Sequence, residues 1–267
     1  LLKWKYPDMK IVAIAHGIEV WREMSGIKKW LLRHADRIIT VSQFTKTKLI
    51  DVQGIEAGKI AVLPNCLDPY FKPPVQLGKP EYLLQRHALQ PEQKVLLTIT
   101  RLSAGEAYKG YDNILRCIPN LLRHWPDLTY IIGGKYDSTE KKRLDGIIAE
   151  LGIEKNVQII GFVSDEELTD YYCLADVFVM PSKKEGFGLV FIEAMACGTP
   201  AIGGNLDGSV EALQPGVLGQ AVNPDDTAEL TAAIQSTLNA RPDVCELQQK
   251  VLERYDYRHY STQLTHI

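Results

Sequence analysis

Two glutamates spaced eight positions apart are the most informative chemical feature of the sequence. Glu185 and Glu193 lie in the stretch PSKKEGFGLVFIEAMACGTPA, residues 181–201. A predicted strand precedes this stretch, Gly186 and Gly188 interrupt it, and an apolar segment of helical length follows. On one continuous helix, the two carboxylates would be separated by about 12 Å of rise. The glycines instead place the first glutamate in a loop and the second on the helix.

Carboxylates this far apart cannot flank a single bond, but they can hold two ends of one extended ligand. A nucleotide-sugar has the required length, with its sugar at Glu185, its diphosphate at the helix N-terminus and its ribose at Glu193. A carboxylate suits ribose because it accepts two hydroxyl hydrogen bonds at once. The alternative interpretation is that both glutamates are helix-cap and surface charges.

Three further groups follow predicted strands, where open α/β sheets bind ligands. Arg101 and Lys109 follow VLLTIT, and two cations there would neutralise a diphosphate. His16 follows KIVAIA and would face the same cleft from another domain. Phe162 and Val163 follow VQII and would offer an edge to a nucleobase. Taken singly, each of these residues is better explained as a surface or structural residue.

The elements that must position these residues alternate along the chain, which predicts an α/β fold with parallel sheets. The predicted strands are mostly apolar throughout, as in sheets buried on both faces. They cover residues 10–15, 37–41, 59–63, 95–100, 129–132, 157–160, 177–180 and 200–203. The predicted helices cover residues 26–35, 45–51, 111–124, 140–151, 165–175, 189–197, 226–239 and 243–254. Capping boxes are expected at Ser164 and Asp226.

A proline-rich seam at residues 65–80 predicts a boundary between two domains. Only three strands precede the seam, so residues 1–73 are expected to be the second part of an incomplete domain. Residues 74–254 hold enough strands and helices for a complete Rossmann-like domain. The first residue is Leu1, which agrees with a chain whose beginning is missing.

Composition narrows the class of protein. The 267 residues carry 30 Lys and Arg against 33 Asp and Glu, which argues against a nucleic-acid-binding protein dominated by phosphate contacts. No apolar run approaches a membrane-spanning length. The five cysteines form neither a zinc-site spacing nor a disulfide framework, which is typical of a reducing, cytoplasmic compartment. Residues 1–73 are net basic and contain Trp4, Trp21 and Trp30, which allows peripheral contact with a membrane.

Taken together, the motifs resemble the retaining glycosyltransferases of the GT-B fold, specifically glycosyltransferase family 4. The family signature is a glutamate, seven residues and a second glutamate, here Glu185 to Glu193. The resemblance extends over most of residues 10–265. It implies two Rossmann-like domains that face a cleft, the N-terminal one incomplete here, and a terminal helix over residues 255–267 that packs back on the first domain.

The resemblance also implies a role for each motif residue. Arg101 and Lys109 would bind the donor diphosphate, Glu193 the ribose, and Phe162 and Val163 the base. Glu185 would hold the transferred sugar, and His16 would contact the sugar or the reacting centre, so these two are the expected catalytic residues. Backbone N–H groups of the loop would share the diphosphate, at Gly186, Phe187, Gly188 and Leu189.

The implied activity is transfer of a hexose from a UDP-, GDP- or ADP-sugar to a glycan, lipid or small-molecule acceptor, with retention of configuration. The resemblance implies no cofactor and no metal, because Arg and Lys neutralise the donor diphosphate. The sequence has no Asp-x-Asp, which agrees with this expectation. Residues 1–9 lack the family's Gly-rich phosphate loop, which leaves open a nucleotide-sugar-binding module without turnover. Another GT-B enzyme, such as a phosphorylase or an epimerase, is a further alternative. A nicotinamide-dependent dehydrogenase fits less well, because no Gly-x-Gly-x-x-Gly opens a helix.

Overall fold

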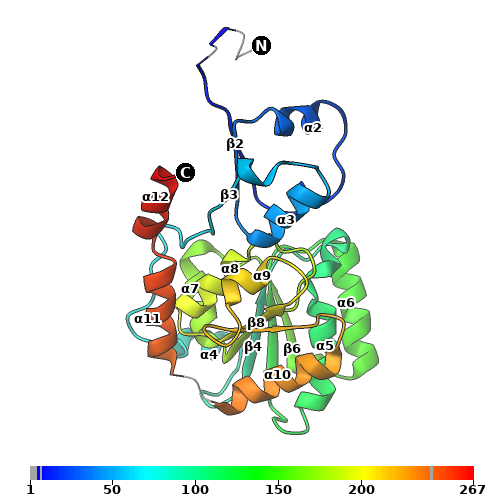
Figure 1. Ribbon diagram of the computed structural model, residues 1–267. Coiled ribbons are helices and arrows are strands. Elements are labelled where there is room, and N and C mark those ends of the chain that lie inside the picture. The colour runs from blue at the N-terminus through cyan, green and yellow to red at the C-terminus, as the bar shows by residue number, and fades with distance from the viewer. Residues whose placement is uncertain (1–4, 7, 241–242) are drawn as a thin grey trace.

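The computed structural model describes residues 5–6, 8–240 and 243–267, which form two parallel sheets flanked by helices (Figure 1). The first sheet, with its two helices, is called the small unit. Its strands run in the order β1-β2-β3 and pair in parallel. The bounds are β1 (Val12–Ala15), α2 (Gly26–Arg33), β2 (Arg37–Thr40), α3 (Gln43–Asp51) and β3 (Ile60–Val62).

The second sheet, with its helices up to α11, is called the large unit. Its six parallel strands are ordered β6-β5-β4-β7-β8-β9. The strands are β4 (Val95–Ile99), β5 (Thr129–Gly133), β6 (Val157–Gly161), β7 (Val177–Met180), β8 (Ala201–Gly204) and β9 (Gln220–Val222). The helices are α4 (Glu81–Arg86), α5 (Tyr111–Leu121), α6 (Ser138–Leu151), α7 (Asp165–Leu174), α8 (Leu189–Ala196), α9 (Ser209–Leu213), α10 (Thr227–Ala240) and α11 (Val244–Arg254). A last helix, α12 (Tyr257–Thr265), lies beyond α11.

The predicted α/β class and parallel pairing are confirmed, and every predicted strand and helix is present with bounds shifted by a few residues. Three short elements, α4, α9 and β9, were not predicted. The helices α4 and α9 have too few residues to show a helical period, and β9, with the sequence QAV, lacks the apolar run that marks the other strands. α9 in particular begins in Asp207-Gly208-Ser209, which has the composition of a turn.

The order of the strands in the large unit fixes where a ligand can bind. The chain builds β4, β5 and β6 outward in one direction and then returns to place β7 on the other side of β4. Loops that leave β4 and β7 therefore diverge to opposite faces, which opens a crevice at the carboxyl ends of these strands. Arg101 and Lys109 follow β4, and Glu185 follows β7, so the topology brings them to the same crevice.

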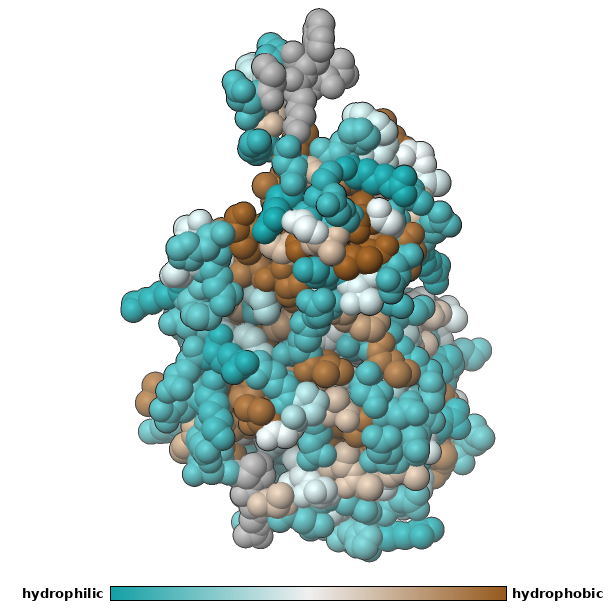
Figure 2. Space-filling view, viewed as in Figure 1, coloured by the Kyte–Doolittle hydropathy of each residue, from teal (hydrophilic) through white to brown (hydrophobic). Residues whose placement is uncertain are grey.

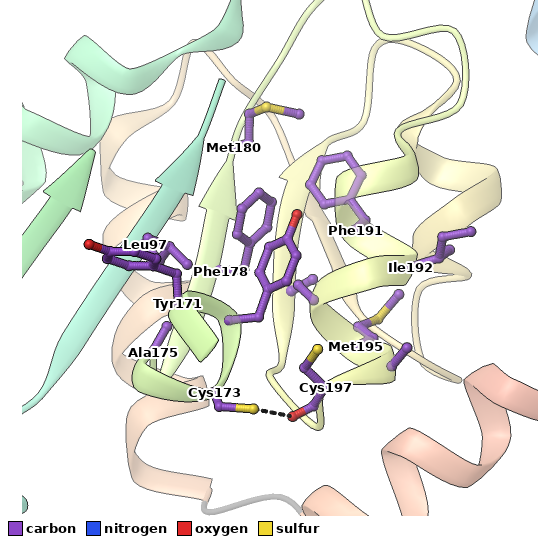
Figure 3. Close-up of a cluster of buried hydrophobic side chains, with 14 of the residues drawn as sticks. Leu97, Tyr171, Cys173, Ala175, Phe178, Met180, Phe191, Ile192, Met195 and Cys197 are labelled. Atoms are coloured by element: carbon purple, nitrogen blue, oxygen red, sulfur yellow. Dashed lines mark hydrogen bonds between the residues drawn. The ribbon is translucent and has the colours of Figure 1, made fainter. Parts of the chain in front are cut away.

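α8, the helix after Glu185, is anchored in the core of the large unit. Phe191, Ala194 and Met195 are fully buried, as expected for a helix that is apolar on nearly all sides. The ring of Phe191 packs edge to face on Phe178 of β7 at 5.8 Å, and Figure 3 shows the two rings side by side beneath Met180. The position of Glu193 along α8 is thereby fixed by packing.

One of the two predicted capping boxes differs from expectation. Asp226 caps α10 as predicted, because its carboxylate accepts hydrogen bonds from the N–H groups of Ala228 and Glu229 at 2.9 Å each. Ser164 is the N-cap residue of α7, but its side chain makes no capping bond to the backbone. Its hydroxyl bonds to the side chain of Glu166 instead, which lowers the pKa of that carboxyl.

The small unit exposes apolar side chains on its edge strand β1. Val12 and Ile14 on the edge strand β1 are 52% and 60% exposed. Figure 2 shows hydrophobic side chains gathered over the small unit on the viewed face. Among residues 5–6, 8–240 and 243–267, no helix is long and apolar enough to cross a membrane.

Candidate functional site

A cavity of about 330 Å³ lies at the carboxyl ends of β4 and β7, with the small unit across from it. It brings together residues from both units and from the seam between them. The residues around it are His16, Asn65, Ile99, Thr100, Lys109, Met180, Glu185, Phe187, Gly188, Leu189 and Val190. Five of the predicted substrate-contacting residues therefore join His16 in one cavity, as the switch in strand order requires.

The central polar contact of this cavity joins Lys109 and Glu185. The Lys109 ammonium donates to Glu185 Oε2 at 2.5 Å, and the two side chains are only 16% and 20% exposed. The chain leaves Lys109 through a tight turn at Gly110, where a Cβ atom would lie 2.4 Å from the carbonyl oxygen of Pro181. Because that turn presses on the segment after β7, Lys109 is held next to the Glu185 loop.

Asp207, a residue that sequence reasoning did not assign to the site, anchors the Glu185 loop from below. Its carboxylate accepts hydrogen bonds from the Glu185 N–H at 2.6 Å and from the Ser182 hydroxyl at 2.7 Å. Gly208 N–H donates to the Glu185 carbonyl at 2.8 Å. Burial raises the pKa of Asp207, and the hydrogen bonds it accepts oppose that shift. The loop is therefore fixed by its backbone, and the Glu185 side chain is left directed to Lys109.

The two units meet backbone to backbone at the mouth of the cavity. A Cβ atom on Gly186 would lie 1.8 Å from the His16 carbonyl oxygen, and one on Gly17 would lie 2.8 Å from the Gly186 Cα. Gly208 also lies close to Gly186, because a Cβ atom on Gly208 would lie 2.1 Å from the Gly186 carbonyl oxygen. Only glycine fits such a contact, so this sequence permits His16 to lie directly over the Glu185 loop.

Arg101 is placed at the crevice but outside the cavity lining. Its side chain is 79% exposed and pairs with Glu106 at 2.5 Å. The other carboxylate oxygen of Glu106, Oε2, is buried without a hydrogen-bond partner. Arg101 is thus mostly open to solvent, whereas Lys109 is enclosed.

Glu193 lies on α8, as predicted, but is not among the residues that line the cavity. It accepts a hydrogen bond from the fully buried Tyr172 hydroxyl at 2.9 Å. Burial raises the pKa of Glu193, and the Tyr172 hydroxyl partly opposes that effect. Glu193 is therefore a partly buried carboxylate with one protein donor, and its remaining acceptor capacity is available to a ligand.

Phe162 and Val163 occupy different environments. The Phe162 ring is 65% exposed and carries the Lys135 ammonium at 4.9 Å from its centroid. Val163 is buried against the end of β5, close to Gly133. Of the two, only Phe162 offers an open aromatic surface. Lys135 beside it was missed by sequence reasoning because a single lysine after a Gly-Gly turn carries no signal of its own.

The loop residues after Glu185 also divide into two kinds. Phe187 is 2% exposed, and its ring packs edge to face on Tyr255 at 5.9 Å, so its side chain is part of the core although it borders the cavity. Gly188 is the N-cap of α8 with φ of 91°, and Leu189 is 43% exposed. Asn65, Thr100 and Met180 also line the cavity without having been predicted as site residues. Only the tertiary fold brings them there.

Within the part of the chain that the structure describes, no cluster of His, Cys, Asp or Glu has the grouping needed to hold a metal ion. The charged pair in the cavity, Lys109 and Glu185, joins a cation directly to a carboxylate. What this arrangement can do chemically is bind an anionic group at Lys109 and hydroxyl groups at Glu185.

Known proteins are similar to this chain in both sequence and fold. Residues 81–255 match the family described as glycosyl transferases group 1, and residues 1–71 match glycosyltransferase family 4. A GDP-mannose-dependent alpha-(1-6)-phosphatidylinositol monomannoside mannosyltransferase of Mycolicibacterium smegmatis is 30% identical over 242 residues, 86% of this chain. A glycogen synthase of Mycobacterium tuberculosis is 28% identical over 246 residues, 88% of this chain. The chain spans 61% and 56% of the lengths of these two relatives.

Solved structures agree on the architecture. The Anabaena protein Alr3699/HepE in complex with UDP has a TM-score of 0.82 at 23% identity, and the match covers 99% of this chain and 73% of that one. Sucrose-phosphate synthase from Thermosynechococcus elongatus has a TM-score of 0.80 at 24% identity, covering 99% of this chain and 69% of that one. With a family match over most of its residues, the chain belongs to the glycosyl transferases group 1 family, of the family 4 type, and has the GT-B fold.

Proposed function

We propose that this chain carries the donor site of a glycosyltransferase, which transfers a hexose from a nucleotide-diphosphate-sugar with retention of configuration. The observation that carries the proposal is the Lys109–Glu185 pair, enclosed at the switch in strand order with His16 across the cavity. The proposal draws support from the family match and from structures of the Anabaena protein Alr3699/HepE in complex with UDP and glucose and with UDP-glucose.

The proposed roles follow the chemistry of each group. Lys109 and Arg101 neutralise the diphosphate, together with backbone N–H groups from Gly186 to Leu189. Glu185 accepts hydrogen bonds from the sugar hydroxyls, Glu193 from the ribose, and Phe162 with Val163 borders the base. His16, from the small unit, contacts the sugar at the reacting centre.

The reaction needs stabilisation of charge that develops on the leaving diphosphate as the glycosyl–oxygen bond lengthens. Fixed cations lower that barrier when they bind the separated charge more tightly than the intact donor. Lys109 is held in place by Glu185 before any ligand arrives, so its reorganisation cost is small. Because lysine and arginine supply the positive charge, we propose that donor binding needs no metal.

The same proposal divides the chain at residues 1–73, 74–254 and 255–267, as the acceptor-side domain, the donor domain and a returning helix. α12 borders a cavity of about 810 Å³ with the seam residues Pro64 to Cys66, which supports that return. The acceptor is proposed to be a sugar or a lipid-linked sugar. The five cysteines are all free thiols, which supports a cytoplasmic location.

Peripheral contact with an anionic membrane is proposed through α2. There Ile27, Trp30 and Leu31 are exposed beside Lys28 and Lys29. A basic helix with exposed apolar side chains binds anionic lipid surfaces. Co-sedimentation with phosphatidylglycerol vesicles and with phosphatidylcholine vesicles tests the proposed membrane contact. The proposal is contradicted if the protein binds neither kind of vesicle.

The donor site is tested by calorimetric titration of this chain with UDP, GDP and ADP in the presence of a chelator. Micromolar binding of one of them, lost in Lys109→Ala and kept in Lys141→Ala, is the expected result. Lys141 is the matched control because it pairs with Asp145 on the surface of α6. Absence of binding to all three nucleotides would contradict the proposed site. Transfer from the matching nucleotide-sugar then separates a transferase from a binding module without turnover.

A further inference from the structure

Glu211 on α9 of the large unit bonds directly to the backbone of the small unit. Its Oε2 accepts from the Gln43 N–H at 2.7 Å, and its Oε1 accepts from the Phe44 N–H at 2.9 Å. Both carboxylate oxygens of Glu211 therefore accept a hydrogen bond, from residues that lie 168 and 167 positions earlier in the sequence. The side chain is half-buried, so water competes less for these bonds than at an open surface.

The partner of Glu211 is the N-terminus of α3, whose first N–H groups have no acceptor within the helix. Ser42 caps one of them, because its hydroxyl accepts from the Thr45 N–H at 3.1 Å. The Lys46 N–H makes the first bond within the helix, to the Ser42 carbonyl at 3.1 Å. Gln43 and Phe44 are left to the carboxylate from the large unit. A negative charge at this position is also favoured by the helix dipole.

Glu211 is connected by short steps to the Glu185 loop. Asp207 accepts from the Glu185 N–H, and it also accepts from the Ser209 N–H at 2.9 Å, at the first residue of α9. α9 carries Glu211 and is only five residues long. The Glu185 loop is therefore connected to Glu211 through Asp207 and the first turn of α9.

The other end of α9 is held by Tyr255. Its hydroxyl donates to the Glu211 carbonyl at 3.0 Å and accepts from Gln214 at 2.8 Å. The same tyrosine packs on Phe187 in the Glu185 loop, and its carbonyl accepts from the Leu67 N–H in the seam at 2.9 Å. α9 is thus a rigid support for Glu211, fixed to both the loop and the seam.

We propose that Glu211 is a positioning residue that clasps the small unit onto the large unit and so holds His16 over the Glu185 loop. The clasp is defined as the Glu211 carboxylate with the Gln43 and Phe44 N–H groups. The contact between the backbones of Gly186 and His16 is van der Waals packing, which does not fix the orientation of the two units. The hydrogen bonds of the clasp are directional and fix that orientation. The clasp between the two units does not depend on the proposed function. Only the effect of the clasp on catalysis rests on that function.

Two measurements on the full chain test the clasp without any ligand. Hydrogen exchange of the Gln43 and Phe44 amides is compared in wild type, Glu211→Ala, Glu211→Gln and the control Glu229→Ala. Glu229 is matched because it is an exposed acidic residue in the first turn of α10. Loss of a bond to a charged acceptor should speed exchange at these two amides by about tenfold to hundredfold in Glu211→Ala. Glu211→Gln retains one acceptor and should fall between, while Glu229→Ala should match wild type.

Small-angle X-ray scattering of the same proteins reports the separation of the units. We expect a larger maximum dimension for Glu211→Ala than for wild type or Glu229→Ala, with unchanged far-UV circular dichroism. If Glu211→Ala does not fold, Glu211→Gln carries the comparison. Equal exchange at Gln43 and Phe44 together with equal scattering in wild type and in the folded variants would overturn the proposal.

Titration with UDP, GDP and ADP separates this proposal from the proposed function. If a nucleotide binds, it should bind more weakly to Glu211→Ala although Glu211 lies outside the cavity lining. An unchanged affinity in a variant that opens would overturn the link between the clasp and the donor site. If wild type binds none of the three, the proposed function fails while exchange and scattering still decide the clasp.

Discussion

The ammonium of Lys109 and the carboxylate of Glu185 lie 2.5 Å apart, although 76 residues separate them in sequence. One follows β4 and the other follows β7, the two neighbouring strands at which the order of the sheet reverses. Because the pair is mostly buried, its attraction is screened less than that of a surface ion pair. A bound diphosphate would share the Lys109 charge, and a sugar would take the free acceptor sites of Glu185.

Removing the Lys109 ammonium should weaken phosphate binding specifically. Lys109→Ala is expected to reduce affinity for the preferred nucleoside diphosphate by at least tenfold, and affinity for the matching nucleoside hardly at all. Calorimetric titration with both ligands checks this, with Lys141→Ala as the surface control. Equal losses for nucleoside and diphosphate would show that Lys109 does not contact phosphate.

Changing Glu185 should separate the sugar from the nucleotide. Glu185→Gln removes the charge that pairs with Lys109, so nucleoside diphosphate affinity should stay the same or rise. Transfer from the nucleotide-sugar should fall by about a hundredfold or more, because the carboxylate that holds the sugar hydroxyls is lost. Paired titrations and turnover measurements test this. Retained turnover in Glu185→Gln would contradict a role at the sugar.

The raised pKa of Glu193 gives a pH dependence with a definite sign. Burial stabilises the protonated form, so the folded chain binds this proton up to a higher pH than the unfolded chain. In the proposed role the Glu193 carboxylate accepts hydrogen bonds from the ribose, so nucleotide affinity should fall as the pH drops through the raised pKa. Titrations between about pH 5 and pH 8 should show this loss in wild type and a weaker, pH-independent affinity in Glu193→Gln.

The same shift predicts the direction of the stability change. Since the folded state holds the Glu193 proton more tightly, the free energy of unfolding falls as the pH rises from the ordinary glutamate pKa through the raised one. Glu193→Gln should remove that part of the slope. Urea denaturation of both proteins over this range tests it, and parallel curves would contradict it.

A pair of glycine substitutions separates backbone contact from helix propensity. Gly186→Ala places a Cβ 1.8 Å from the His16 carbonyl oxygen, so the units must shift apart, at a cost of about 1–3 kcal/mol in unfolding free energy. Gly146→Ala meets nothing within 4 Å on α6 and should stabilise the chain by about 0.5–1 kcal/mol. Thermal and urea denaturation measure both. The contact would be disproved if Gly186→Ala were as stable as wild type and bound nucleotide equally.

Asp207 should prove to be a structural support for the loop. In wild type, the Asp207 carboxylate accepts hydrogen bonds from donors that include the Glu185 N–H and the Ser182 hydroxyl. Asp207→Asn replaces one carboxylate oxygen with an NH₂ group, which cannot accept from these donors. We expect a loss of about 1–3 kcal/mol in unfolding free energy and weaker nucleotide binding. Chemical denaturation with titration checks both effects. Asp225→Asn, at an exposed aspartate, is the control that should leave both unchanged.

Much of the fold could be predicted because most strands are apolar runs and most helices show a helical apolar period. The apolar runs at β4 and β7 and the Gly-bounded helix α8 follow from local composition, and Glu185 and Glu193 were placed on loop and helix by two glycines. Their neighbours were not predictable in the same way. α9 is too short to show a helical period, β9 has no apolar run, and α9 carries Glu211.

The sequence by itself determined the residue types, the strand–helix alternation and the positions of Lys109, Glu185 and His16 at strand ends. Only the tertiary structure decided that Lys109 pairs with Glu185, that Glu193 lies against Tyr172 beside the cavity, and that Phe187 belongs to the core. It also decided that Glu211 reaches α3. The physical reason is that local patterns report which backbone conformation a segment adopts, whereas these contacts depend on strand order and close backbone packing between segments far apart in the chain.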